Sequence, residues 1–294
     1  MTLVTSRDLP DLSDDLRGLK EALTALGVDV RIAVWDDPEV DWEEAGLCVV
    51  LTITDYADRP EEFFRWADTV PRILNDARVL RWNSDKHYLV ELERRGVPTI
   101  KTTWLEPDAN LSKHQVHTRM PALGDFVVKS SLSSNRHTTG RYTAIDARSR
   151  SAAIQHALGI LGKGRAALIQ RYFKSSAEDG EVSIVFFNGV LSHAVSKEGI
   201  LQTEADPGNR PRSWARLHEV TREEWNLAEE VRRQLHTAIK EHAGRDHLLI
   251  YARIDMLHTD EGLKLLEVNL MDVTLYLQVA PEAIENLANA IAVR

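Results

Sequence analysis

The feature that most constrains the fold lies near the C-terminal end, in the stretch YARIDMLHTDEGLKLLEVNL at residues 251–270. Two runs of alternating apolar and polar side chains flank a short DEG turn, a pattern typical of a β-hairpin. Because side chains alternate along a strand, Arg253 and Asp255 share one face. A turn centred on the DEG tip places Asp255 opposite Glu267. The same register sets Arg253 opposite Asn269.

This register brings two carboxylates and an amide oxygen within one cross-strand spacing of about 5 Å. Carboxylates that face each other repel unless a positive charge lies between them. Mg²⁺ prefers oxygen ligands of this kind and completes its coordination with water and substrate phosphates. We therefore predict that Asp255, Glu267 and Asn269 bind Mg²⁺. A solvent-exposed hairpin that merely carries charges is the alternative, and a slip of one residue in the register removes the site.

The composition excludes several classes of protein. The chain has 294 residues and a formal net charge of −9, with no basic block of the kind that binds nucleic acid. No apolar run approaches the ~20 residues of a membrane helix, and no signal peptide is visible. The one cysteine, Cys48, lies in an apolar run and is expected in the core rather than in a disulfide or zinc site. We therefore expect a cytoplasmic protein with no membrane or nucleic-acid partner.

Strands and helices alternate in the first 80 residues. Apolar strands are predicted in TLVTS, VDVRIAVW and GLCVVLTIT, and a leucine stripe predicts an amphipathic helix that is capped by Ser13 and ends at Gly27. Another helix begins at Pro60. The alternation predicts a small parallel α/β domain over residues 1–80. Neither GxGxxG nor GxxxxGK[ST] occurs, which argues against a Rossmann dinucleotide site and a P-loop.

The remainder of the chain predicts mixed α and β structure. A helix is expected from Ser84 to Gly96, followed by the strand DFVVKS and the polar loop SSLSSNRHTTGRY. The segment EVSIVFFNGVLSHAVSK predicts another hairpin, whose Asn-Gly pair is typical of a type I′ turn. We therefore predict an α/β fold, in part α+β, with a central lid subdomain over residues 81–168. A C-terminal subdomain with an antiparallel sheet is expected over residues 169–294.

Three lysines lie at the ends of predicted elements. Lys86 lies in the first turn of its predicted helix, Lys129 ends the DFVVKS strand, and Lys197 ends the SHAVSK strand. A magnesium–phosphate site needs cations of this kind, and a Ser-rich loop after Lys129 can close over phosphates and offer backbone N–H groups. Each lysine taken alone is also compatible with a solvated surface position. Their order along the chain, before the acidic hairpin, carries the prediction.

The order of these motifs resembles the ATP-grasp superfamily of ligases. The matching stretches are NSDKHYL, FVVKSSLSSN, LIQRYF, GEVSI, ARIDM and LLEVNL, and the match runs from about Arg81 to Leu277. The combination and its order are specific, although no single piece is. The resemblance implies an ATP-grasp fold, with ATP and Mg²⁺ as cofactors.

The resemblance also implies a role for each matched residue. Lys86 and Lys129 would contact the phosphates of ATP, and Glu181 would bind the ribose hydroxyl groups. Arg253 would stabilise the charge on the transferred phosphoryl group and on the tetrahedral intermediate, and we expect Lys197 to be catalytic as well. The adenine pocket would be lined, partly through backbone groups, by Gln170, Tyr172 and Phe173.

Over the whole chain, the sequence is most similar to ligases of the D-cycloserine-forming cyclo-ligase type. This implies ATP-driven conversion of a carboxylate to an acyl phosphate, which an amine then attacks. Three departures concern the substrate. LTITDY lacks the Arg-Ser pair of the cyclo-ligases, and Asp272-Val273-Thr274 stands where they have Glu-Pro-Ser. Asn269 stands where they have a second Glu, which is closer to the amino-acid ligases. We therefore predict a ligase that joins small amino-acid substrates as a dipeptide or γ-glutamyl amide, in antibiotic biosynthesis. An intramolecular cyclo-ligase is the close alternative, and a non-catalytic ATP-binding module is an alternative of another class.

Five residues are candidates for substrate binding. Arg210, Arg212 and Arg216 lie in or next to an irregular segment rich in Pro and Gly, and a guanidinium can hold a substrate α-carboxylate through two parallel hydrogen bonds. Asp55 and Asp272 are candidates to meet an α-amino group. A structural role is the alternative for each of them. The sequence leaves the oligomeric state open, and a homodimer is one option.

Overall fold

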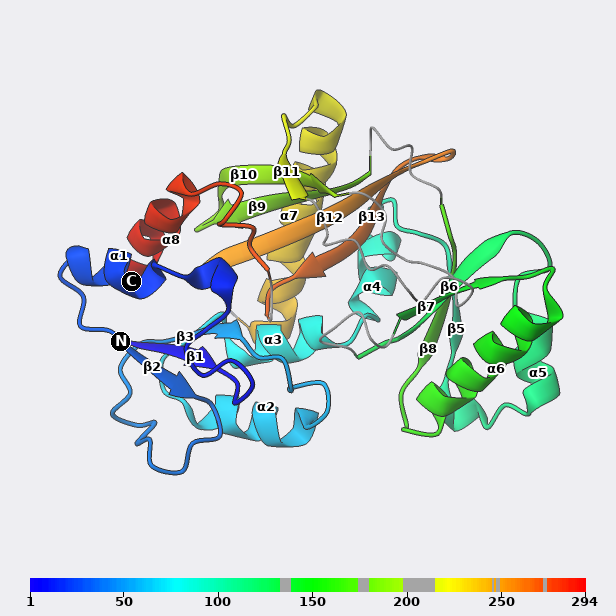
Figure 1. Ribbon diagram of the computed structural model, residues 1–294, viewed down its shortest axis with the longest axis horizontal. Helices are drawn as coiled ribbons and strands as arrows, with labels where there is room; N and C mark the ends of the chain where they lie inside the picture. The colour runs from blue at the N-terminus through cyan, green and yellow to red at the C-terminus, as the bar shows by residue number, and fades with distance from the viewer. Residues whose placement is uncertain (133–138, 174–179, 198–214, 245, 247–248, 272–273) are drawn as a thin grey trace.

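The computed structural model describes the chain except for residues 133–138, 174–179, 198–214, 245, 247–248 and 272–273 (Figure 1). The first of its three sheets is parallel and four-stranded, in the order β2-β1-β3-β4. Its strands are β1 (Thr2–Thr5), β2 (Arg31–Val34), β3 (Cys48–Thr52) and β4 (Ile73–Leu74). This sheet confirms the parallel N-terminal unit predicted from the alternation of strands and helices. Cys48 is buried in it, as expected.

Helices cover both faces of this parallel sheet. On one face α2 (Pro60–Thr69) packs through Phe63 and Phe64 against Val4 and Val50. On the other face lie α1 (Leu19–Ala25) and the C-terminal α8 (Glu282–Ala292), which are neighbours in Figure 1 although they come from opposite ends of the chain. The helix expected from Ser13 begins later, because residues 14–16 form a short 3-10 turn and Gly18 follows with a φ of 92°.

The second sheet is antiparallel and lies at the right of Figure 1, in the order β5-β8-β6-β7. Its strands are β5 (Thr102–Leu105), β6 (Asp125–Ser130), β7 (Thr139–Thr143) and β8 (Ala167–Arg171). The helices α5 (Lys113–Arg119) and α6 (Ala147–Leu161) cover one face and share an apolar core with Phe126 and Val128. Since side chains alternate along β6, Val127 and Lys129 lie on the opposite face.

The third sheet has five antiparallel strands in the order β11-β10-β9-β12-β13. They are β9 (Glu181–Phe187), β10 (Val190–Lys197), β11 (Ala215–Leu217), β12 (Tyr251–Thr259) and β13 (Gly262–Asn269). One face packs against the long helix α7 (Arg222–Ala243) and against α3 (Ala77–Ser84) and α4 (Tyr88–Arg94). The Asn188-Gly189 turn between β9 and β10 has a positive φ at both residues, which agrees with the predicted type I′ turn.

The helix predicted from Ser84 to Gly96 is not continuous with its expected start. Ser84 is the last residue of α3, and α4 begins only at Tyr88, so Lys86 lies in the turn between two helices. The backbone N–H of Lys86 donates to the carbonyl of Ser131, just beyond the end of β6, at 2.9 Å. The limits predicted for the three domains, near residues 80 and 168, stay a prediction.

Candidate active site

The late hairpin has the register predicted from its sequence. Asp255 pairs with Glu267, and Arg253 pairs with Asn269. The register shifts by one residue directly after Asp255, and the strands close at Thr259 and Gly262. The side chain of Asp255 is 1% exposed, whereas that of Glu267 is 24% exposed. The carboxylate of Asp255 is therefore shielded from bulk solvent, and that of Glu267 is only partly exposed.

Asp255 is the most constrained side chain of this group. It accepts hydrogen bonds from Arg253 Nε at 2.9 Å and Nη2 at 2.7 Å, from Ser183 Oγ at 2.5 Å, and from the amide of Asn269 at 3.1 Å. Burial by itself raises the pKa of Asp255, but the charges of Arg253 and Lys197 outweigh it and lower the pKa to about 2. Asp255 is therefore ionised at neutral pH.

Three lysines from separate elements converge on these carboxylates. Lys86 Nζ lies 3.8 Å from Glu267 Oε2. Burial lowers the pKa of Lys129 to about 8, partly offset by the charge of Glu267 and reinforced by Lys86. Lys197 donates to Glu181, and although burial opposes its charge, Asp255 and Glu181 raise its pKa. The structure thus brings together the lysines that the sequence placed at element ends.

The residues of the hairpin fit a magnesium ion that also binds phosphate. Within the described residues, no cluster of three or more His, Cys, Asp or Glu side chains could hold a metal ion on its own. The candidate set is two carboxylates and one amide oxygen, so a metal here needs further oxygen ligands, as Mg²⁺ with a nucleotide does. Four cationic side chains lie around three carboxylates, so the site has an excess of one positive charge. A bound triphosphate carries more negative charge than this excess, which a divalent cation would help to neutralise. The four cations are Lys86, Lys129, Lys197 and Arg253, and the three carboxylates are Glu181, Asp255 and Glu267.

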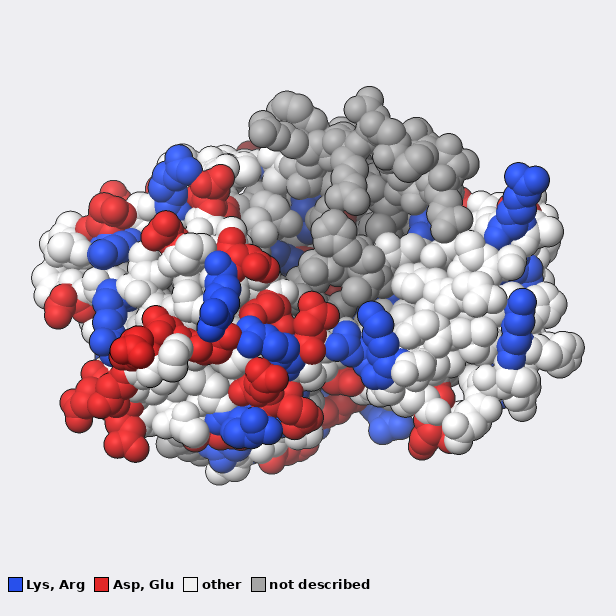
Figure 2. Space-filling view, turned by 60° about the horizontal axis from the view of Figure 1, so that its bottom comes forward, with Lys and Arg blue, Asp and Glu red and all other residues white. Residues whose placement is uncertain are grey.

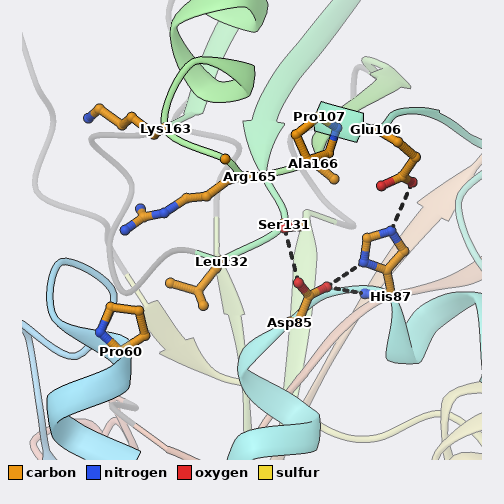
Figure 3. Close-up of a pocket in the computed structure, with 11 residues that line it drawn as sticks. Pro60, Asp85, His87, Glu106, Pro107, Ser131, Leu132, Lys163, Arg165 and Ala166 are labelled. Atoms are coloured by element: carbon orange, nitrogen blue, oxygen red, sulfur yellow. Dashed lines mark hydrogen bonds and ion pairs between the residues drawn. The ribbon is translucent and has the colours of Figure 1, made fainter. Parts of the chain in front are cut away.

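Hydrogen bonds of Asp85 and His87 also hold the turn that carries Lys86 in place. Figure 3 shows a pocket of about 470 Å³ next to it, in which Asp85 accepts from the backbone N–H of His87 at 2.9 Å and from Ser131 Oγ at 3.2 Å. The ring of His87 lies 2.5 Å from Asp85 and 3.1 Å from Glu106. Burial lowers the pKa of His87, but the hydrogen bonds to Glu106 and Asp85 outweigh it and raise the pKa. This network connects the α3–α4 turn to the second sheet.

The residues predicted to line the adenine pocket lie at the end of β8 and just beyond it. Gln170 is buried, and its amide donates to Thr102 Oγ1 at 2.8 Å within the second sheet. The Arg141 guanidinium lies 3.7 Å from the ring centre of Tyr172, and Arg171 lies 4.8 Å from that of Phe173. These contacts place the three residues where the chain leaves the second sheet for the third. Their role toward adenine stays a prediction.

Two of the five predicted substrate residues, Arg216 and Asp55, lie within the described residues. Arg210, Arg212 and Asp272 lie outside the described residues. Arg216 is exposed on the edge strand β11. Asp55 accepts from Trp35 Nε1 at 3.0 Å and pairs with Arg59, so its carboxylate already has two protein partners.

Residues that the sequence did not single out complete the surroundings of Arg253. Asp15 accepts from the backbone N–H groups of Leu275 at 2.6 Å and Tyr276 at 3.0 Å. The Tyr276 ring lies 5.3 Å from Lys197 Nζ and 5.6 Å from the Arg253 guanidinium. Ser183, which donates to Asp255, could have been found from a local pattern, because it lies two residues after Glu181 and therefore on the same face of β9. Asp15 and Tyr276 are brought in by contacts between distant parts of the chain.

Two further properties bear on the partners of the chain. Among the described residues drawn in Figure 2, Lys and Arg side chains are interspersed with Asp and Glu, so this face presents mixed charge. None of the helices within the described residues has the length and apolar character needed to cross a bilayer.

Comparisons with known proteins support one kind of enzyme. A family model described as the N-terminal domain of the D-cycloserine synthetase DcsG matches residues 1–75. The cycloserine biosynthesis protein DcsG of Streptomyces lavendulae is 27% identical, over 100% of this chain and 98% of the relative. A crystal structure of D-cycloserine synthetase DcsG superposes with a TM-score of 0.84 at 25% identity, covering 100% of this chain and 98% of that one. A RimK domain ATP-grasp protein from Sphaerobacter thermophilus shares the fold, with a TM-score of 0.66 at 16% identity over 99% of this chain and 97% of its own.

Proposed function

Because this chain is an ATP-grasp ligase that resembles D-cycloserine synthetase, we propose that it closes an amide bond within one small amino-acid-derived molecule. The observation that carries the proposal is the similarity to DcsG over the full length, including the N-terminal unit that the family model matches. Of the two ligase reactions left open by the sequence, this similarity favours the intramolecular cyclo-ligase over the joining of two molecules, which the sequence alone had favoured. Joining two separate amino acids is the second candidate, favoured by the Glu-x-Asn pattern of Glu267 and Asn269.

The proposed reaction has two steps. A substrate carboxylate oxygen attacks the γ-phosphorus of ATP, ADP leaves, and the resulting acyl phosphate is a better electrophile than the carboxylate. The amine nitrogen then attacks the acyl carbon, phosphate leaves, and the amide is formed. Catalysis by the protein consists mainly of positioning and of stabilising charge where it develops.

Each charged residue of the site has a proposed role. Lys86 and Lys129 bind the phosphates, and Lys197 stabilises the transferred phosphoryl group. Arg253 donates to the oxygen that becomes negative when the amine attacks. Mg²⁺, held by Asp255, Glu267 and Asn269, would supply charge neutralisation of the phosphate oxygens.

The nucleoside end is proposed to bind where β8 leads toward β9. Gln170, Tyr172 and Phe173 are assigned to the adenine, partly through their backbone groups. Glu181 is assigned to the ribose hydroxyl groups, although in this structure it accepts from Lys197. We place the enzyme in the cytoplasm, because ATP and small amino-acid substrates are available there.

An ADP-release assay tests the proposed function. Amino-acid derivatives that carry both a carboxylate and a terminal amine are offered singly and in pairs, and the products are identified by mass spectrometry. We expect one compound alone to release ADP and to lose the mass of one water. Release that requires two compounds together contradicts the intramolecular reaction and supports the second candidate. MgATP binding without ADP release from any compound favours the non-catalytic module.

The pKa of Lys129 predicts how ATP affinity depends on pH. The free enzyme holds this lysine at a pKa of about 8, mainly because burial disfavours its charge. Phosphates favour the ammonium form and raise the pKa in the complex, so binding above pH 8 requires uptake of a proton. The Kd for ATP should therefore rise as pH increases through 8, by up to about tenfold per pH unit. Isothermal titration at several pH values measures this.

Lys129→Arg is the matched control for that dependence. A guanidinium stays charged throughout this pH range, so the variant should bind ATP with little change in Kd above pH 8. Equal pH dependence in the wild type and in Lys129→Arg would show that another group takes up the proton.

A further inference from the structure

The strand that carries two of the candidate metal ligands is an edge strand. β13 is the last strand of the five-stranded sheet, and within the described residues β12 is its one neighbouring strand, apart from an isolated bridge between Leu265 and Thr99. One row of its backbone N–H and C=O groups therefore needs partners other than a strand. The position of Glu267 and Asn269 depends on what covers this row.

Two buried side chains, Asn83 and Tyr88, bind the backbone of the unpaired edge of β13 next to the candidate metal ligands. The Tyr88 hydroxyl donates to the carbonyl of Val268 at 3.0 Å and accepts from its N–H at 2.8 Å. The amide of Asn83 donates to the same carbonyl at 3.0 Å and accepts from the N–H of Leu270 at 3.1 Å. Tyr88 is 4% exposed and Asn83 is 9% exposed, so water does not compete for these bonds.

These contacts bracket both candidate ligands on β13. Val268 lies between Glu267 and Asn269, and its side chain packs into the core formed with α3, α4 and α7. Because neighbouring side chains point to opposite faces, fixing the backbone of Val268 fixes the directions of the two side chains beside it. A shift of this edge by a fraction of a strand spacing would move both oxygen donors.

The same segment carries one of the phosphate lysines. Lys86 lies between Asn83 and Tyr88 in the sequence, and its Nζ lies 3.8 Å from Glu267. The segment from Asn83 to Tyr88 thus contacts β13 from outside the sheet and contributes a cation inside the site. Neither Asn83 nor Tyr88 is among the residues assigned to the nucleotide or the metal.

We propose that Asn83 and Tyr88 are positioning residues that hold β13 so that Glu267 and Asn269 can bind Mg²⁺ together with the nucleotide. This inference rests on the proposed function, because it assumes the magnesium site. A purely structural role predicts a different result. Both roles predict a loss of stability when a bond to Val268 is removed, but only the positioning role predicts a specific loss of metal affinity.

Tyr88→Phe separates the two roles, with Tyr251→Phe as a matched control. Tyr251 is fully buried, and its hydroxyl also donates to a backbone carbonyl, that of Val50 at 2.8 Å, but it belongs to a different core cluster from Val268. The Kd for ADP is measured by isothermal titration with Mg²⁺ and with EDTA, and Tm is measured for each protein. The ratio of the two Kd values reports the contribution of the metal without any need for turnover.

We expect Mg²⁺ to tighten ADP binding in the wild type, and Tyr88→Phe to reduce this effect by about 10-fold to 100-fold. Its metal-free Kd should stay close to that of the wild type. Tyr251→Phe should lower Tm but keep the wild-type ratio. If Tyr88→Phe does not yield folded protein, Asn83→Ala is measured in the same way and should also reduce the ratio.

An unchanged ratio in a folded Tyr88→Phe or Asn83→Ala protein overturns the positioning role and leaves these residues as structural. A wild type whose ADP affinity does not depend on Mg²⁺ overturns the proposal through its premise. These two failures are distinguishable, because only the second one appears in the unmodified protein.

Discussion

Replacement of Arg253 by alanine is expected to lower kcat by about two to three orders of magnitude while ADP still binds. A single donor aimed at a developing oxyanion typically contributes ~3–4 kcal/mol to the transition state. Each 1.36 kcal/mol corresponds to about a tenfold change in rate, which gives the expected loss. ADP release under saturating ATP and substrate measures kcat, and titration with ADP tests binding.

The geometry of Arg253 explains why it can act in this way. Its Nε and Nη2 contact Asp255, and its Nη1 donates to the carbonyl of Thr274 at 2.8 Å. A guanidinium has five N–H donors, and the contacts with described residues leave one N–H on each terminal nitrogen available to a substrate. Two fixed contacts hold the group in place before the reaction, which limits the reorganisation needed when charge develops.

The alanine variant also removes the main partner of a buried carboxylate. Loss of one member of a buried ion pair can cost about 3–5 kcal/mol of stability, so Tm must be measured together with activity. Arg253→Lys keeps the charge but not the planar fork, and we expect a smaller loss of kcat. Arg233→Ala, at an exposed arginine that pairs with Glu230 on α7, is the control that should leave kcat unchanged. Near-normal turnover in a folded Arg253→Ala protein contradicts the assignment.

The ATP-dependent ligase and its ATP-grasp fold could be predicted because the order of several motifs along the chain resembles a known superfamily, whereas the pairing within each hairpin follows from local signals. Alternation along two strands and a short turn sufficed to set the pairing of Asp255 with Glu267. The Asn188-Gly189 turn likewise depends on two residues with positive φ. Such features need no knowledge of distant contacts, which explains why they agree with the structure.

Other parts of the site depend on contacts that no local pattern contains. The stretch around Ser84 and Asp85 has the composition of a helix start, yet the bond from Lys86 to Ser131 turns it into a junction between two helices. Tyr88 lies within the helix predicted from Ser84 to Gly96 and no local pattern singles it out, although its hydroxyl binds the backbone of Val268. Asp15 contacts a segment 260 residues away. Positioning residues of this kind become visible only when the chain is folded.

Glu267→Gln is expected to abolish most of the magnesium-dependent activity, with a loss of more than about 100-fold. Even the loss of an outer-shell partner of a metal ligand typically costs about 10–100-fold, and this change removes the charge of a direct ligand. Burial raises the pKa of Glu267, but Lys86, Lys129 and Arg253 outweigh it and lower the pKa, so the residue is ionised at neutral pH. Glutamine keeps the size of the side chain, which limits any effect on packing.

The direction of the nucleotide effect distinguishes a metal ligand from a structural carboxylate. Without Mg²⁺, Glu267→Gln should bind ADP slightly more tightly than the wild type, because one negative charge near the phosphates is gone. With Mg²⁺, it should bind ADP more weakly than the wild type and need a higher Mg²⁺ concentration for half-maximal turnover. Glu261→Gln, at the exposed tip of the same hairpin, should match the wild type in both conditions. If both variants respond to Mg²⁺ as the wild type does, Glu267 is not a metal ligand and the hairpin serves the phosphates through its cations alone.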